Sequence, residues 1–231
     1  MPAEKDPGLP RAVEAMLALT GLVIVGPVLA LAGLAIALES PGPILFRQVR
    51  VGQNGKPFTL YKLRSMRMDT GKGLGVTAAD DDRTTHVGRF LRKTKLDEFP
   101  ELWNVVAGQM SLVGPRPEVP RYVNLTDPLW QKALAVRPGL TDPVYLGFRD
   151  EEAFMSQVDD DRENYYLTTL QKYKLRGHIE YLERRSWVSD VAILFKTVHA
   201  ILAPSKAPLP DAAEVERIAR GESSPLNTPR K

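Results

Sequence analysis

Cysteine is absent from all 231 residues, which excludes disulfides, thiolate zinc sites and iron–sulfur clusters. Histidine is scarce, and the three that occur, His86, His178 and His199, have no metal-ligand spacing. The chain contains no Walker loop, no G-x-S-x-G elbow and no G-x-G-x-x-G fingerprint. Its net charge of +3 is too small to indicate a nucleic-acid partner. The side chains that could take part in catalysis are therefore mainly carboxylates and basic groups.

Charge is also missing from one long stretch, residues 16–38, in a chain that is otherwise 26% charged and 43% hydrophobic. A continuous helix there would measure roughly 35 Å, enough to cross a hydrocarbon core of about 30 Å. A spanning helix is therefore one interpretation. A secretory signal is a second, but the stretch is longer than a signal's apolar region, and the residues before it mix acidic with basic side chains.

Pro27 supplies a third interpretation, because it follows Gly26 near the middle of the stretch. Proline in a helix interior removes a backbone donor and costs about 3 kcal/mol. Each arm would then be about eleven residues, or roughly 17 Å, which reaches only the bilayer midplane. Basic residues flank the stretch on both sides, so the positive-inside tendency gives no clear inside and outside. A re-entrant hairpin with both ends on one face would explain this directly, and the spanning and re-entrant interpretations both stay open at this point.

After this segment, residues 44–51 and 57–66 predict two strands around Gly52-Gln-Asn-Gly55, a strong hairpin turn signal. Lys62 and Arg64 share one face of the second strand by its period of two. Residues 69–82 are rich in Gly, Asp and Thr and predict a flexible loop. Residues 84–95 have apolar positions at helical spacing and predict a basic amphipathic helix.

An adjacent acidic pair, Asp97 and Glu98, follows that helix, and Arg116 comes nineteen positions after Asp97 in a Gly-Pro-Arg-Pro turn. Asp97 is placed to cap a helix that has Pro100 in its first turn and ends at Gly108. The helix N-terminus would keep the carboxylate ionised and draw in phosphate. An ionised carboxylate can attack phosphorus, provided that cations offset the like charges.

Several long motifs in one order carry a resemblance to a known family. They are Ser-Pro-Gly-Pro at 40–43, Tyr-Lys-Leu-Arg-Ser-Met at 61–66, Leu-Asp-Glu-Phe-Pro at 96–100, Gly-Pro-Arg-Pro at 114–117 and Arg-Pro-Gly-Leu-Thr at 137–141. Over roughly residues 12–203 the chain resembles the monotopic phosphoglycosyl transferases, which open polyprenol-linked glycan assembly in bacteria. Phe99 and Glu101 depart from the pattern, since the family usually has Leu and Gln there.

The resemblance implies a two-step reaction. Asp97 would attack a UDP-sugar, release UMP and hold a phosphosugar, which a polyprenol phosphate would then remove as polyprenol-diphospho-sugar. Glu98 would handle a proton or orient the acceptor phosphate. Mg²⁺ would bridge Asp97 and the diphosphate. The basic residues available to bind phosphate are Lys62, Arg64, Arg92 and Arg116. The resemblance places Arg92 and Lys62 near the acceptor and donor phosphates.

The expected fold is α+β: a re-entrant membrane helix-hairpin broken at Pro27, followed by a mostly helical cytosolic domain with a small β-hairpin. Residues 1–40 would form the membrane segment, 41–203 the catalytic domain and 204–231 a mobile tail with a short helix near 212–220. We expect the cytoplasmic face of the inner membrane, with membrane lipids, a UDP-sugar and polyprenol phosphate as partners. Homo-oligomerisation stays open. The alternative is a membrane-anchored scaffold that binds anionic lipid without catalysis.

Overall fold

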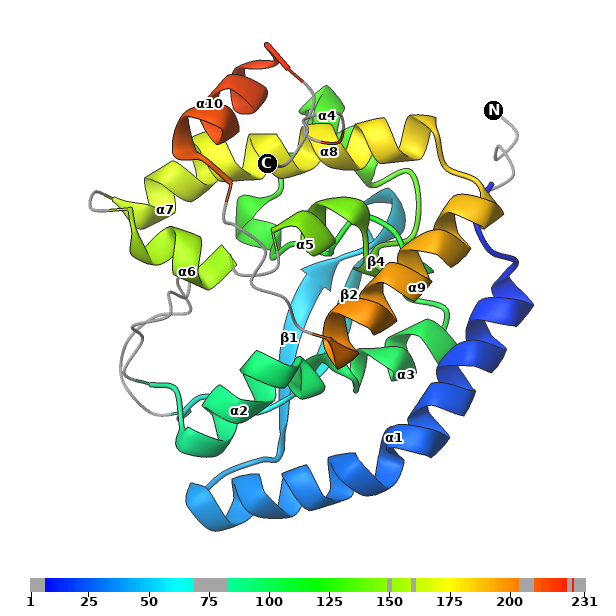
Figure 1. The fold of residues 1–231 in the computed structure, drawn as a ribbon, viewed down its shortest axis with the longest axis vertical. Helices are drawn as coiled ribbons and strands as arrows, with labels where there is room; N and C mark the ends of the chain where they lie inside the picture. Colours follow the sequence, from blue (N-terminus) through cyan, green and yellow to red (C-terminus); the bar gives the residue numbers. More distant parts are fainter. Residues whose placement is uncertain are drawn as a thin grey trace.

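A computed structural model of the chain describes residues 7–68, 83–148, 151–158, 161–203, 210–223 and 226, without the side chain at 152. The whole loop predicted at 69–82 and part of the tail predicted at 204–231 therefore lie outside the described residues. The described part is mostly helical with two small sheets, as expected (Figure 1). Its regular elements are α1 Arg11–Glu39, β1 Leu45–Val51, β2 Pro57–Leu63, α2 His86–Thr94, α3 Glu101–Val106, β3 Ser111–Val113, α4 Pro128–Ala133, β4 Gly139–Thr141, α5 Pro143–Gly147, α6 Glu151–Ser156, α7 Arg162–Tyr165, α8 Gln171–Glu183, α9 Trp187–Leu202 and α10 Ala212–Arg220. Short 3-10 turns also occur at Gln53–Gly55 (η1), Leu96–Glu98 (η2) and Pro120–Tyr122 (η3), and Tyr166–Leu170 (η4) is a π-helix that leads into α8.

The predicted hairpin is confirmed. Strands β1 and β2 pair antiparallel, with Leu45 opposite Leu63 and Val51 opposite Pro57. Asn54 and Gly55 in the turn both have positive φ, which asparagine and glycine adopt readily. The buried side chain of Asn104 on α3 bonds the β2 backbone, donating to Thr59 O at 2.6 Å and accepting from Tyr61 N at 3.3 Å. This contact fixes α3 against the strand that carries Lys62.

A second, parallel sheet joins β3 to β4 and was not predicted from the sequence. It brings the Gly-Pro-Arg-Pro turn against the Arg-Pro-Gly-Leu-Thr motif. Gly114 N donates to Thr141 O at 3.0 Å, and Gly139 N donates to Pro115 O at 2.9 Å. A Cβ on Gly139 would overlap the backbone of Gly114, so this close approach requires glycine. The turn that holds Arg116 is therefore clamped by backbone bonds.

The predicted break at Pro27 is not confirmed. The helix α1 continues through Pro27 for 29 residues, and its ribbon changes direction near the middle (Figure 1). Proline removes only the bond to the carbonyl of Val23, so the surrounding helical bonds can carry the chain through a bend rather than an end. By length and composition α1 is the one helix in the described residues that could cross a membrane.

Both ends of α1 are bonded to the rest of the molecule. Near its start, buried Glu14 accepts from Leu112 N at 3.0 Å and from Arg137 at 3.3 Å. At its end, Glu39 accepts from the first backbone N–H groups of α2, His86 N at 2.6 Å and Val87 N at 3.0 Å. Both ends of the helix are therefore tied to one folded body, and α1 also packs against α3 and α2.

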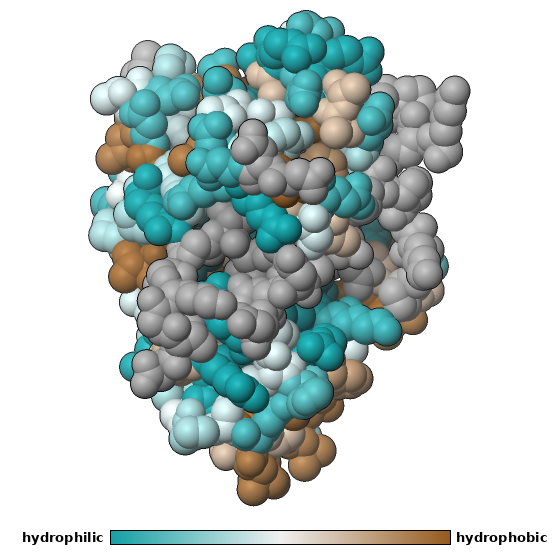
Figure 2. Space-filling model, turned by 90° about the vertical axis from the view of Figure 1, so that its left-hand side faces the viewer, coloured by the Kyte–Doolittle hydropathy of each residue, from teal (hydrophilic) through white to brown (hydrophobic). Residues whose placement is uncertain are grey.

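Large apolar side chains stay exposed along α1 and α9. Val23 and Ile24 on α1 are each 71% exposed, and Phe195 and Leu202 on α9 are 71% and 79% exposed. Brown, hydrophobic atoms gather at the lower end of the molecule in Figure 2, at the height where Figure 1 draws the second half of α1. This apolar surface contrasts with the buried core formed where α1, β2, α3, β3, α8 and α9 meet.

The short helix predicted in the tail is present as α10, capped by Asp211 at its start and Gly221 at its end. Its Val215 and Ile218 are fully buried in a second core with η4 and α8. Tyr166 and Tyr173 are buried in the same core.

Candidate active site

Asp97 does not cap a helix, contrary to the sequence prediction. Lys95 adopts a left-handed conformation that ends α2, the chain enters the short turn η2, and α3 begins only at Glu101. The start of α3 has no side-chain cap. Asp97 is 7% exposed, and its Oδ1 atom is buried without a hydrogen-bond partner among the described residues. No capping role therefore accounts for this carboxylate.

The groups around Asp97 shift its pKa in opposite directions. Burial raises its pKa above the ordinary value, and the neighbouring Glu98 raises it further. Lys62, Lys95 and Arg92 lower the pKa in turn, without cancelling the rise. Asp97 is thus a buried carboxyl facing three cations, with one oxygen uncommitted.

Glu98 is the opposite case, because its oxygens are fully engaged. Lys62 Nζ donates to Oε1 at 3.1 Å, Arg116 NH2 donates to the same oxygen at 2.5 Å, and the Tyr145 hydroxyl donates to Oε2 at 2.9 Å. Burial alone would raise the pKa of Glu98, but Arg116, Lys62 and Lys95 outweigh it and hold the pKa well below the ordinary value. Glu98 is therefore a fixed anion that positions its three partners.

Arg116 owes its position to the clamped Gly-Pro-Arg-Pro turn. Its NH1 atom donates to Leu140 O at 3.1 Å, and its guanidinium carbon lies 4.6 Å from the centre of the Tyr145 ring. The side chain is 25% exposed, so it keeps an accessible edge. A planar guanidinium held in this way suits bidentate phosphate contact.

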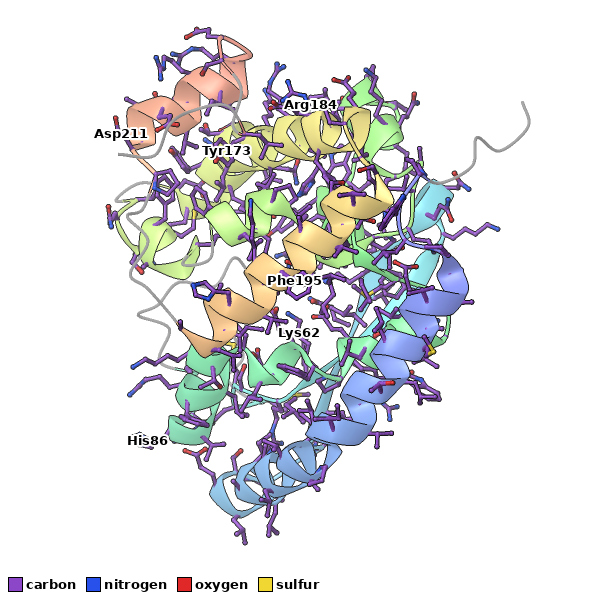
Figure 3. All side chains as sticks on the ribbon, turned by 45° about the vertical axis from the view of Figure 1, so that its right-hand side comes forward. Lys62, His86, Tyr173, Arg184, Phe195 and Asp211 are labelled. Atoms are coloured by element: carbon purple, nitrogen blue, oxygen red, sulfur yellow. The ribbon has the colours of Figure 1, made fainter. Side chains whose placement is uncertain are left out.

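Lys62 approaches the same carboxylates from β2. Its Nζ atom lies 3.1 Å from Glu98 and 3.2 Å from Glu101, and its side chain is 19% exposed. Figure 3 places Lys62 near mid-height, below the labelled Phe195 of α9 and above the lower end of α1. The structure thus joins Lys62, Glu98 and Arg116, which the sequence assigned to one site.

The two other predicted basic residues lie differently. Arg92 acts on Asp97 electrostatically, and its NH1 atom donates to Thr84 Oγ1 at 3.5 Å. Arg64 is not brought into the cluster: it is 2% exposed and donates to Pro41 O at 2.8 Å and Ser40 O at 2.6 Å. Its guanidinium binds the carbonyl oxygens of the two residues that follow α1.

Two residues of the cluster were missed as site residues. Tyr145 stands on α5, whose first turn is capped by buried Asp142, which in turn lies 3.4 Å from His178. Glu101 is fully buried on α3, 3.7 Å from Arg116 as well as beside Lys62. The sequence did contain an indication for Glu101, because the resembled family usually has Gln at that position. Nothing in the spacing of Tyr145 indicated that it belongs to the site.

A divalent cation fits this chemistry only in part. Within the described residues, no group of three or more His, Asp or Glu side chains could hold a metal ion. Magnesium is commonly bound by one or two carboxylates together with substrate phosphates, however. The uncommitted Oδ1 atom of Asp97 matches that requirement for one hard oxygen ligand.

Comparison of the chain with known proteins identifies its family. Residues 7–204 match the family model described as bacterial sugar transferase. A Caulobacter vibrioides protein named UDP-glucose:undecaprenyl-phosphate glucose-1-phosphate transferase is 36% identical over 201 residues, which cover 85% of this chain and 71% of that protein. An Escherichia coli protein of the same name is 37% identical over 196 residues, 82% of this chain and 39% of its own length.

A third relative is named for a different sugar. The Aeromonas hydrophila protein UDP-N-acetylgalactosamine-undecaprenyl-phosphate N-acetylgalactosaminephosphotransferase is 33% identical over 196 residues, 83% of this chain and 43% of that protein. The chain thus spans less than half of the Escherichia coli and Aeromonas relatives. The family match nevertheless covers most of the chain and contains every residue of the site. The chain belongs to the bacterial sugar transferase family.

Proposed function

We propose that this protein transfers a sugar 1-phosphate from a UDP-sugar to a membrane polyprenol phosphate, giving polyprenol-diphospho-sugar and UMP. The observation that carries the proposal is the buried, uncommitted Oδ1 atom of Asp97 beside a cationic cluster. The names of the relatives support the donor and acceptor classes, and they differ in the sugar.

In the first step Asp97 Oδ1 bonds to the β-phosphorus of the donor, and the bond from that phosphorus to the bridging oxygen breaks. UMP leaves with the bridging oxygen. In the second step an oxygen of the polyprenol phosphate attacks the same phosphorus and displaces Asp97, which recovers its carboxylate. Covalent catalysis of this kind divides one difficult displacement into two easier ones.

The remaining residues of the site would bind and orient. Arg116 and Lys62 would hold the diphosphate, and Arg92 would lower the cost of bringing an anion to Asp97. Glu98 would keep Arg116, Lys62 and Tyr145 in place. Its depressed pKa favours this orienting role over proton handling. A Mg²⁺ ion on Asp97 and the diphosphate would offset charge on the reacting phosphoryl group.

We further propose that α1 is re-entrant and holds the site at the cytoplasmic face of the inner membrane. The bonds from both ends of α1 to one folded body support this topology. A spanning helix has its ends on opposite faces of a core about 30 Å thick. The polyprenol chain would stay in the bilayer while its phosphate meets Asp97 at headgroup level.

The reaction is tested by incubating purified protein with Mg²⁺, polyprenol phosphate and a panel of UDP-sugars that includes glucose and N-acetylgalactosamine. We expect UMP release with at least one donor, and a phosphosugar adduct on Asp97 in acid-quenched protein by mass spectrometry. Asp97→Asn should abolish both. Free phosphate as product would indicate a phosphatase, and binding of anionic lipid without UMP release would indicate a scaffold.

A further inference from the structure

Glu101 is the buried titratable group that the proposed mechanism does not use. Its side chain is 1% exposed, and both carboxyl oxygens are buried without a hydrogen bond in the described part of the chain. Its only close charged contacts in this part are Lys62 Nζ at 3.2 Å and Arg116 NH2 at 3.7 Å. These are the two cations that face the donor phosphates in the proposed function.

Within the described part of the chain, the charged and titratable groups that act most strongly on Glu101 belong to the same cluster. Lys62 comes from β2, Arg116 from the turn after β3, Glu98 from η2 and Tyr145 from α5. Burial raises the pKa of Glu101 and Glu98 raises it further, whereas Lys62 and Arg116 lower it. The charge on Glu101 therefore depends on how fully these two cations are available to it.

A bound diphosphate would compete for the same two cations. Glu98 also has the hydroxyl of Tyr145 at 2.9 Å, a donor for which the phosphate need not compete. Glu101 has no such third donor in the described residues. A buried carboxylate that loses its compensating charge binds a proton, because the neutral form is less costly to bury.

We propose that Glu101 takes up a proton from solvent when the donor diphosphate binds Lys62 and Arg116, so that donor affinity in this protein is linked to pH. This inference rests on the proposed function and adds a residue that sets the charge of the donor site. Glutamine at this position has nearly the same shape but cannot titrate. By linkage, uptake of one proton makes the donor dissociation constant rise about tenfold per pH unit.

The test is calorimetric titration of the full-length protein with UDP-glucose and with UDP-N-acetylgalactosamine. Asp97→Asn is the background, because it blocks turnover and removes the titration of Asp97 itself. Titrations run from pH 5.5 to 8.5 at fixed Mg²⁺, each in two buffers of different ionisation enthalpy, which yields the number of protons taken up. Glu101→Gln is added to the background, and Glu151→Gln is the matched control, since Glu151 pairs with Lys174 at 2.6 Å on a different element pair.

We expect proton uptake that approaches one per bound donor within this pH range in the background and in the Glu151→Gln control. Adding Glu101→Gln should remove the uptake and flatten the pH dependence of the dissociation constant, with thermal unfolding showing that the variant is folded. Equal proton counts with and without Glu101, or no uptake at any pH, would overturn the inference. Absence of binding by both UDP-sugars in every variant would instead overturn the donor-binding function on which it rests.

Discussion

Asp97 and Glu98 are adjacent in the sequence, yet their carboxylates have opposite surroundings. Glu98 accepts from Lys62, Arg116 and Tyr145, which stabilises its anion, whereas Asp97 is buried with an oxygen that binds nothing in the described residues. Burial therefore raises the pKa of Asp97, and the three donors depress that of Glu98. Glu98 is therefore held by structural contacts, whereas Asp97 has an oxygen available for the proposed reaction.

This difference predicts that Asp97→Asn is more stable than the wild type at pH 7 while being inactive. A carboxyl with a raised pKa binds more protons in the folded state, so its contribution to stability falls as the pH rises through the ordinary Asp value toward the folded value. The stability difference should shrink as the pH falls toward 3.8, the ordinary value for this group. Urea unfolding without divalent cations, at pH 7 and near pH 4, measures the difference in the free energy of unfolding between the two proteins. Lower stability of Asp97→Asn than of the wild type at pH 7 would contradict the prediction.

At the scale of elements, the β3–β4 sheet positions the arginine of the site. The two strands are short, but their backbone bonds to the turn at 114–117 fix where Arg116 leaves the chain. Arg116 in turn contacts Glu98 and lies over the ring of Tyr145. A local change in this sheet should therefore affect both folding and the phosphate site.

Gly139→Ala tests this coupling, because its Cβ would overlap the backbone of Gly114. We expect a loss of about 1–3 kcal/mol in the free energy of unfolding, as for other overpacked sites. The KM for the UDP-sugar should also rise, because Arg116 shifts with the turn. Gly26→Ala is the matched control, since a Cβ there has nothing within 4 Å. Unchanged stability and KM in Gly139→Ala would show that the sheet does not position Arg116.

The hairpin, the basic helix and the grouping of Lys62, Glu98 and Arg116 could be predicted, because local turn chemistry and contiguous motifs encode them. The predicted capping role of Asp97 was wrong, because the left-handed Lys95 and a 3-10 turn come before α3, and no local pattern indicates them. Arg64 was grouped with Lys62 by strand alternation, but β2 ends at Leu63. The parallel sheet and Tyr145 depend on contacts between distant segments, which no local pattern reports.

At the scale of the whole molecule, α1 both begins and ends on the folded body. Glu14 is bonded near β3 and Glu39 at the start of α2, while several large apolar side chains between them, Val23 and Ile24 among them, are exposed. The bend near the middle of α1 allows this return (Figure 1). The bonds at both ends support the proposal that the helix enters one leaflet and leaves on the same side.

The absence of cysteine makes this topology directly testable. Ala12→Cys and Lys56→Cys introduce single thiols at exposed positions on either side of the apolar stretch. We expect a membrane-impermeant maleimide to label both thiols in inverted inner-membrane vesicles and neither in intact spheroplasts. The cysteine-free parent controls for background labelling. Labelling of only one of the two thiols in spheroplasts would show that α1 spans the bilayer.

The attachment of α1 at both ends also has a mechanical consequence. A transmembrane anchor adjusts its tilt to the thickness of the bilayer, and any domain it carries moves with it. In the proposed topology the immersed part would be the bent helix α1, held at both ends by the protein's own contacts. Its depth would then be set by protein geometry, and the height of Asp97 above the acyl chains would be the same in thin and thick membranes.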